Sequence, residues 1–289
     1  MHGSGKKESH DWTDTYPEYW GPTEDHLPCC SRVKFMHMDT SSVGWNDYGS
    51  SSTLCTAALR LSALAYNPSL IKPPEIQLKA LSEDEKVVRD VTIISHSLGG
   101  LMVLHGLSTQ CSLDTSSKLI NIQVPMEGTG ATDHLYQVCG SVESRFKKMV
   151  QKIAISNNMC PIDKSNQSLF SVQGPYADAS LKADYAVVQE TFRTHVHAVL
   201  CGVKVKGLSF VNSFKLQLIS WFTPTYGSIT DGMVDLKSCR GGFPEKNFTS
   251  DYRHPFYLAK INHADGMLRG SDSWHRKSRK PIHWLQCQF

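Results

Sequence analysis

A serine at an expected sharp bend is the first residue of this chain that could do chemistry. Ser97 lies in the string SHSLG (residues 95–99), between the β-branched run 91–94 and an apolar pattern at helical spacing over 101–107. A serine hydroxyl becomes a useful nucleophile when a base takes its proton and donors stabilise the oxyanion formed by its attack. A strand-turn-helix would expose such a hydroxyl, so this context predicts a nucleophile at Ser97.

The segment around Ser97 carries a family resemblance. Residues 95–100 (SHSLGG) resemble the Gly-His-Ser-Leu-Gly-Gly turn of many lipases, which are α/β-hydrolases. Ser95 departs from the pattern, which has glycine there, but serine is small enough to fit with modest strain. The alternative is that Ser97 only caps a helix in a non-catalytic protein. The resemblance implies an α/β-hydrolase fold: a mostly parallel sheet with helices on both faces.

Two later segments resemble those in which lipases present their catalytic acid and base. Residues 230–234 (TDGMV) are similar to the first, and residues 260–265 (KINHAD) to the second, in the family order of serine, acid and histidine. The resemblance implies that Asp231 orients an imidazole, and that His263 takes the proton of Ser97 and later returns it.

Other residues stay open for these two roles. Asp235 is the second candidate for the acid, and His254 or His283 for the base. His96 is expected to be a packing or polar-contact residue, because its backbone position should point it away from Ser97.

The oxyanion donors are also implied by the resemblance. One is the backbone N–H of Leu98, the residue after the nucleophile. The other comes in the family from a His-Gly loop, which residues 2–5 (HGSG) resemble, and this implies the N–H of Ser4. A hydrophobic strand usually leads into that loop, so we expect the N-terminal strands to be missing and the chain to be truncated. The alternative is a glycine-rich terminus without a role.

The resemblance extends along most of the chain in short motifs. Residues 125–133 are similar to the segment after the next lipase strand. We expect one α/β-hydrolase domain over 1–289, with a lid- or cap-like insertion around 134–184. An amphipathic helix over 143–155 could cover the site, although a core-facing helix explains its pattern equally well.

The remaining pattern predicts alternating strands and helices. We expect strands over 32–38 and 119–124, helices over 51–66 and within 183–203, and a long loop with a short helix over 6–30. Strands that alternate with helices favour a parallel sheet covered on both faces.

Composition excludes several classes of protein. A net charge of +3 gives no reason to expect a nucleic-acid partner. The basic run 276–280 is interpreted as a solvated tail, with a polyanion or membrane-surface contact as the alternative. No apolar stretch is long enough to cross a bilayer.

Metal and cofactor sites find no support in the spacing of the chain. Asp265 stands where some bacterial lipases have a calcium ligand, but residues 203–230 offer no partnering aspartate. No zinc spacing is present either. We therefore expect no metal and no cofactor.

Cysteines give an expectation about the compartment. Nine cysteines and glycosylation sequons at Asn166 and Asn247 favour disulfides and secretion, although no signal peptide follows Met1. An odd number leaves at least one thiol unpaired. A cytoplasmic location is the alternative.

Together the motifs predict a serine hydrolase that cleaves carboxylic esters, lipid-like or otherwise, through an acyl-enzyme. Two alternatives stay open: a catalytically weak or inactive hydrolase-fold protein that serves as a binding or secreted interaction module, and an acyltransferase that uses an alcohol in place of water.

Overall fold

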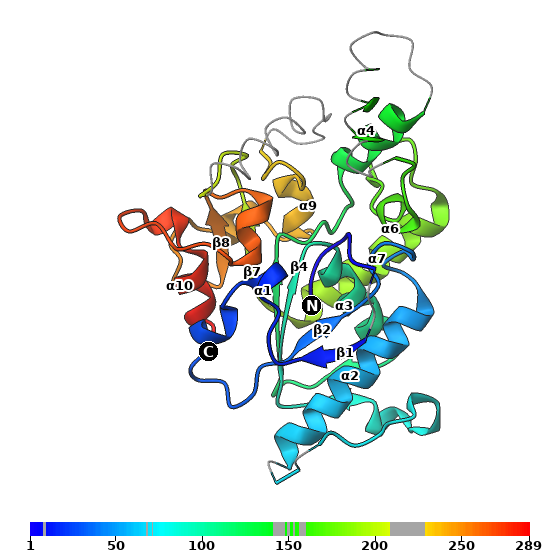
Figure 1. The fold of residues 1–289 in the computed structure, drawn as a ribbon, viewed down its shortest axis with the longest axis vertical. Helices are drawn as coiled ribbons and strands as arrows, with labels where there is room; N and C mark the ends of the chain where they lie inside the picture. Colours follow the sequence, from blue (N-terminus) through cyan, green and yellow to red (C-terminus); the bar gives the residue numbers. More distant parts are fainter. Residues whose placement is uncertain are drawn as a thin grey trace.

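A four-stranded parallel sheet forms the centre of the molecule (Figure 1). The structure is a computed structural model that describes residues 1–7, 10–67, 69–70, 72–140, 148, 151–152, 154–155, 160–208 and 229–289. The sheet has the order β4-β6-β7-β8, with β4 (Thr92–His96), β6 (Lys118–Ile122), β7 (Val196–Gly202) and β8 (Phe256–Ala259). Two smaller sheets pair β1 (His10–Thr13) antiparallel with β2 (Phe35–His37), and β3 (Val87–Val88) parallel with β5 (Ser112–Leu113).

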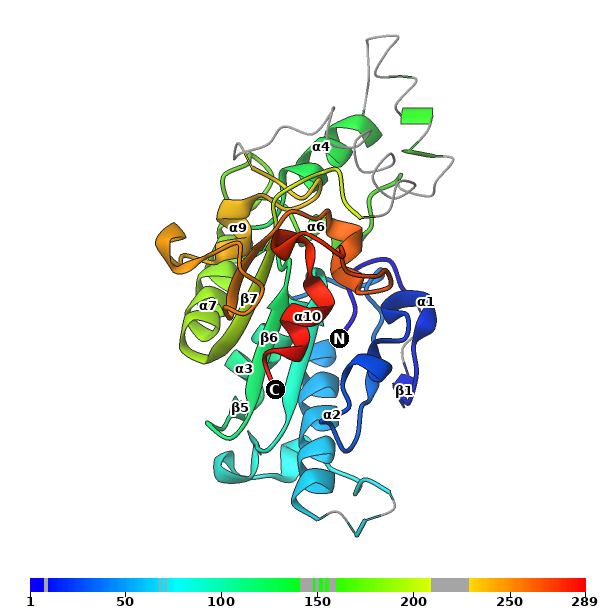
Figure 2. The same ribbon diagram turned by 90° about the vertical axis from the view of Figure 1, so that its left-hand side faces the viewer.

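Helices cover both faces of the central sheet (Figures 1 and 2). The α-helices described are α1 (Pro17–Trp20), α2 (Tyr48–Tyr66), α3 (Leu98–Thr109), α4 (Gly130–Cys139), α6 (Lys164–Gln167), α7 (Ala179–His195), α9 (Leu236–Arg240) and α10 (Pro281–Gln286). Short 3₁₀ helices span Thr23–His26, Leu78–Ala80, Glu83–Glu85, Glu245–Asn247, His263–Met267 and Lys277–Arg279. Side chains of α2, α3 and α7 pack in one apolar cluster, and those of α1 and α10 pack in the other.

The strand β7 is apolar on both faces because each face meets one of these layers. Along β7, Val199 and Cys201 join the cluster beneath α3 and α7, whereas Ala198 and Leu200 join the cluster beneath α10. Successive side chains of a strand point to opposite faces, so a strand buried on both sides reads as a continuous apolar run.

The predicted fold class is confirmed, and most of the expected elements lie close to their predicted places. The expected strands over 32–38, 91–94 and 119–124 correspond to β2, β4 and β6, and the expected helix over 51–66 corresponds to α2. The helical stretch expected within 183–203 is present as the later part of α7, and it is followed by β7 (Val196–Gly202), a strand that the sequence pattern did not predict. The helix expected over 143–155 lies mostly outside the described residues.

The first residue of the chain lies on the outer edge of β4. The terminal amino group of Met1 donates to the carbonyl of Ile94 at 2.7 Å, and the N–H of His96 donates to the carbonyl of Met1 at 3.1 Å. Burial lowers the pKa of this amine to about 5. Met1 thus continues the parallel hydrogen-bond pattern of the sheet, and it brings residues 2–4 to the end of β4.

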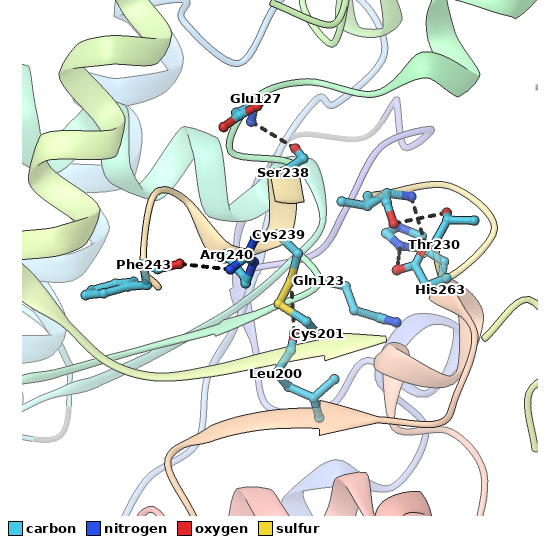
Figure 3. Close-up of a disulfide and its surroundings, with 12 residues drawn as sticks. Gln123, Glu127, Leu200, Cys201, Thr230, Ser238, Cys239, Arg240, Phe243 and His263 are labelled. Carbon is cyan, nitrogen blue, oxygen red and sulfur yellow. Dashed lines mark hydrogen bonds and ion pairs between the residues drawn. A yellow bond between two sulfur atoms is a disulfide. The ribbon is translucent and has the colours of Figure 1, made fainter. Parts of the chain in front are cut away.

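Three disulfides connect the elements around the sheet: Cys55–Cys111, Cys139–Cys160 and Cys201–Cys239. The remaining cysteines, Cys29, Cys30 and Cys287, are unpaired. The first disulfide joins α2 to Cys111, two residues beyond the end of α3, and the third joins the end of β7 to α9 (Figure 3). The expected disulfides are therefore present. Among the helices described, none combines the length and apolarity that a bilayer crossing requires.

Candidate active site

The turn that carries Ser97 joins β4 directly to α3. Ser97 has φ 55° and ψ −136°, a conformation that non-glycine residues rarely adopt. Such strain persists only where the surroundings hold it in place, and it is typical of functional sites. Two glycines allow the tight packing: a Cβ on Gly99 would lie 2.1 Å from the carbonyl oxygen of His2, and one on Gly100 would lie 2.2 Å from Val124 Cγ2. The glycines after Ser97 therefore allow His2 and Val124 to pack directly against this turn.

Ser95, the residue that departs from the lipase pattern, has a partner of its own. Its hydroxyl donates to Asn121 Oδ1 on the neighbouring strand at 2.8 Å, and both side chains are fully buried. Among the described residues, Asn121 Nδ2 has no hydrogen-bond partner. A glycine at position 95 would leave this amide without any partner, so serine here is matched to Asn121.

Replacing Ser95 by glycine should therefore destabilise the protein. We expect Ser95→Gly to lower the free energy of unfolding by about 1–3 kcal/mol, because a buried acceptor loses its donor, and to leave the Ser97 turn in place. Urea unfolding followed by fluorescence measures this change. The double variant Ser95→Gly/Asn121→Leu removes the unpaired amide and should recover much of the loss, whereas an unchanged stability in the single variant would contradict the pairing.

Ser97, His263 and Asp231, here called the candidate triad, form a continuous hydrogen-bonded chain. The Ser97 Oγ lies 2.9 Å from His263 Nε2, and His263 Nδ1 lies 2.9 Å from Asp231 Oδ2. A carboxylate can only accept from Nδ1–H, so the lone pair of Nε2 faces the serine hydroxyl. This is the arrangement in which an imidazole can take a proton from a serine.

Backbone groups hold Asp231 in place. Its side chain is 1% exposed, and its Oδ1 accepts from the N–H groups of Met233 and Val234 at 2.9 and 2.8 Å. The N–H of His263 donates to the backbone carbonyl of Asp231 at 3.0 Å. The acid and the histidine are therefore joined through both the side chain and the backbone.

Hydrogen bonds from the backbone to the Asp265 carboxylate hold the loop of His263 in its conformation. Asp265 and Asn262 form a reciprocal capping box at the start of the 3₁₀ helix His263–Met267. Asp265 Oδ2 also accepts from the N–H of Leu208 at 2.7 Å. Asp265 thus binds backbone donors, and within the described part of the chain no group of three or more His, Cys, Asp or Glu side chains is arranged for a metal ion.

The two positions expected to supply oxyanion donors lie on either side of Ser97. Leu98 is the first residue of α3, where backbone N–H groups have no partner within the helix. Gly3 packs directly on the nucleophile turn, since a Cβ on Gly3 would lie 2.9 Å from Ser97 Cβ. Ser4 follows it and is exposed. The structure thus brings both segments to the same end of β4.

The open alternatives for acid and base lie elsewhere. Asp235 is the N-cap residue of α9. His254 and His283 are exposed; the first contacts the backbone of Phe256, and the second contacts Asp272. The histidine that hydrogen-bonds to Ser97 is His263.

His96 lies beside the candidate triad without contacting the Ser97 hydroxyl through a hydrogen bond. Its Nδ1 lies 2.6 Å from the hydroxyl of Tyr19, and its Nε2 lies 3.1 Å from the carbonyl of His263. Burial, followed by the nearby charge of His263, holds the pKa of His96 well below its usual range. The sequence predicts a packing or polar contact for His96 but not its partner: Tyr19 lies in α1, within the segment 6–30 that is predicted as a long loop with a short helix.

An apolar cavity of about 550 Å³ lies next to β4. It follows the outer edge of β4 and is lined by residues that include Met1, Trp20, Leu54 and Ile94, but by none of the candidate triad. The candidate triad therefore lies outside the lining of this cavity, at the end of β4.

Comparisons with known proteins agree with this topology. Neither the protein-family models nor the curated protein sequences gave a match. Among solved structures, the chain is similar to the Bacillus licheniformis lipase BlEst2 in mature form, at 14% identity and a TM-score of 0.52, over 93% of this chain and 85% of that one. It also aligns with Staphylococcus hyicus lipase, at 12% identity and a TM-score of 0.42, over 99% and 92% of the two chains. The parallel sheet, its helical layers and the first of these similarities together show that the chain has the α/β-hydrolase fold.

Proposed function

We propose that the protein is a serine hydrolase that cleaves carboxylic esters. The observation that carries this proposal is the hydrogen-bonded chain from Ser97 Oγ through His263 to Asp231, with Ser97 on a strained turn at the end of β4. The similarity to a bacterial lipase supports the reaction class, because that protein has the same fold.

The reaction begins with acyl transfer to the enzyme. The Ser97 Oγ attacks the ester carbonyl carbon while His263 Nε2 takes the proton of Ser97. Asp231 stabilises the imidazolium that forms. The N–H groups of Leu98 and Ser4 stabilise the tetrahedral oxyanion. The bond to the alcohol then breaks, and the alcohol leaves with the proton held by His263.

Water completes the cycle. His263 takes a proton from water as the water oxygen attacks the acyl-enzyme, and it returns this proton to Ser97 when the carboxylic acid leaves. Every proton therefore passes through one imidazole nitrogen, and no metal or cofactor takes part in the proposed cycle.

The domain and the compartment follow as further parts of the proposal. We infer one catalytic domain over 1–289 with a lid- or cap-like insertion around 134–184. We also infer an oxidising, extracellular compartment, because three disulfides persist where thiols are not kept reduced.

A fluorophosphonate probe tests the proposal directly, since it reacts covalently with an activated serine. We expect one adduct per chain, mapped by mass spectrometry to Ser97, together with release of p-nitrophenol from short and long p-nitrophenyl esters. A folded protein that gives neither an adduct nor turnover would overturn the proposal in favour of a binding module. Product analysis with added alcohol would reveal an acyltransferase by an ester product in place of the acid.

A further inference from the structure

Two buried side chains hold the loop that carries His263. His96 at the end of β4 and Gln123 just after β6 are 2% and 0% exposed. Gln123 Nε2 donates to the carbonyl of Asn262 at 2.9 Å, and His96 Nε2 lies 3.1 Å from the carbonyl of His263. Side chains at the ends of the neighbouring strands β4 and β6 therefore bind two successive carbonyls of the loop that carries His263.

Gln123 sits in a space that two glycines leave open. A Cβ on Gly266 would lie 1.9 Å from Gln123 Oε1, and a Cβ on Gly202 would lie 2.1 Å from Gln123 Nε2. Gln123 also has a positive φ of 50°, which is costly for a residue other than glycine. Figure 3 shows Gln123 beside the Cys201–Cys239 disulfide, with His263 on the adjacent loop.

The hydroxyl of Tyr19 extends this contact to the other side of the site. It lies 2.6 Å from His96 Nδ1 and accepts from the N–H of Gly3 at 2.6 Å. A carbonyl can only accept, so His96 Nε2 must be the nitrogen that donates to His263. In the neutral ring, Nδ1 of His96 is then an acceptor, so the Tyr19 O–H donates to Nδ1. The Tyr19 oxygen in turn accepts from the N–H of Gly3.

These hydrogen bonds join two segments that flank Ser97. At one end is Gly3, whose backbone packs on Ser97 and precedes Ser4, the proposed oxyanion donor. At the other end is the backbone of His263, the proposed base. Burial favours the neutral form of His96, which this set of donors and acceptors requires.

We propose that Tyr19 and His96 are positioning residues. They hold Gly3, next to the proposed oxyanion donor, and the loop of His263, the proposed base, at fixed positions relative to Ser97. This inference rests on the proposed esterase function. Because neither side chain needs to touch the ester, removing the bridge should lower kcat and leave KM nearly unchanged. Small displacements of reacting groups cost about 10- to 100-fold in rate.

Tyr19→Phe is the first test, because it keeps the ring and removes only the hydroxyl. We expect kcat, normalised to Ser97 sites titrated with a fluorophosphonate, to fall by about 10- to 100-fold. Tyr257→Phe is the matched control: Tyr257 is also buried, and its hydroxyl also makes two hydrogen bonds, donating to the carbonyl of Lys277 at 2.9 Å and accepting from the N–H of Lys280 at 3.1 Å. It should lower the urea midpoint similarly and leave the normalised kcat unchanged.

His96 provides a second test through its donor. His96→Gln keeps an N–H that can reach the carbonyl of His263, whereas His96→Leu keeps only volume. We expect the Leu variant to lose about 100-fold in kcat and the Gln variant to recover part of this loss. The double variant Tyr19→Phe/His96→Leu should lose less than the product of the two single losses, because both side chains belong to one hydrogen-bonded chain.

The outcomes separate this inference from the proposed function. If the wild type labels at Ser97 and Tyr19→Phe keeps the normalised kcat of the wild type, the positioning role is wrong and the esterase function stands. If Tyr19→Phe and Tyr257→Phe lose kcat equally, the effect is general destabilisation and the positioning role is wrong. If the wild type itself neither labels nor turns over esters, the proposed function fails and the positioning role fails with it.

Discussion

Ser97→Ala is expected to reduce kcat for p-nitrophenyl ester hydrolysis by about 10⁴- to 10⁶-fold. The variant loses the oxygen that would form the acyl-enzyme, and His263 then has no hydroxyl within 2.9 Å to deprotonate. What remains should be slow attack of water on esters bound near the oxyanion donors. Turnover is measured with short and long esters, on protein whose fold is checked by circular dichroism.

Ser95→Gly is the matched control for this variant. It alters a buried serine two positions away, at a cost in stability, but Ser95 makes its hydrogen bond to Asn121 and not to the candidate triad. We expect Ser95→Gly to keep its turnover and its fluorophosphonate adduct. If Ser97→Ala hydrolyses esters as fast as Ser95→Gly, Ser97 is not the nucleophile.

Asp231→Asn is expected to lower kcat by about 10⁴-fold with little change in shape. The asparagine oxygen can still accept from the N–H groups of Met233 and Val234, which turns its NH₂ group towards His263 Nδ1. Nδ1 must then accept, the proton moves to Nε2, and the imidazole can no longer take a proton from Ser97. The rate is measured with saturating ester at neutral pH.

Asp235→Asn separates the two candidates for the acid. Asp235 lies in the same segment, is also buried, and is the N-cap residue of α9. We expect this variant to keep most of its activity. A large loss for Asp235→Asn together with full activity for Asp231→Asn would transfer the role of the acid to Asp235.

The parts of the fold that the sequence predicts well are those in which local pattern and tertiary packing agree. The β-branched run before Ser97 and the glycines after it define β4, the turn and the start of α3, because close packing there allows few other residues. The segments of Asp231 and His263 are located in the sequence by their resemblance to lipase segments, and local hydrogen bonds to the backbone hold each of them in the fold.

Other features depend on partners that lie far away in the chain. Val196–Gly202 follows α7 without a glycine or proline break, and a short apolar run of this kind reads equally well as a buried helix or a buried strand. Tyr19 stands in a polar, aromatic segment with no periodicity, and its contact with His96 spans 77 residues. Only the folded chain reveals such a contact.

The Cys201–Cys239 disulfide has a consequence for how active protein could be made. It closes a loop of 38 residues that contains Asp231, and both sulfurs are buried. In the chain-entropy model, closing a loop of this length contributes about 4 kcal/mol to stability. Reagents reach these sulfurs only before the chain has packed, so oxidation has to accompany folding. Synthesis in a reducing cytoplasm would leave the segment of the acid without its covalent anchor, whereas folding alongside a thiol oxidant and an isomerase would supply it.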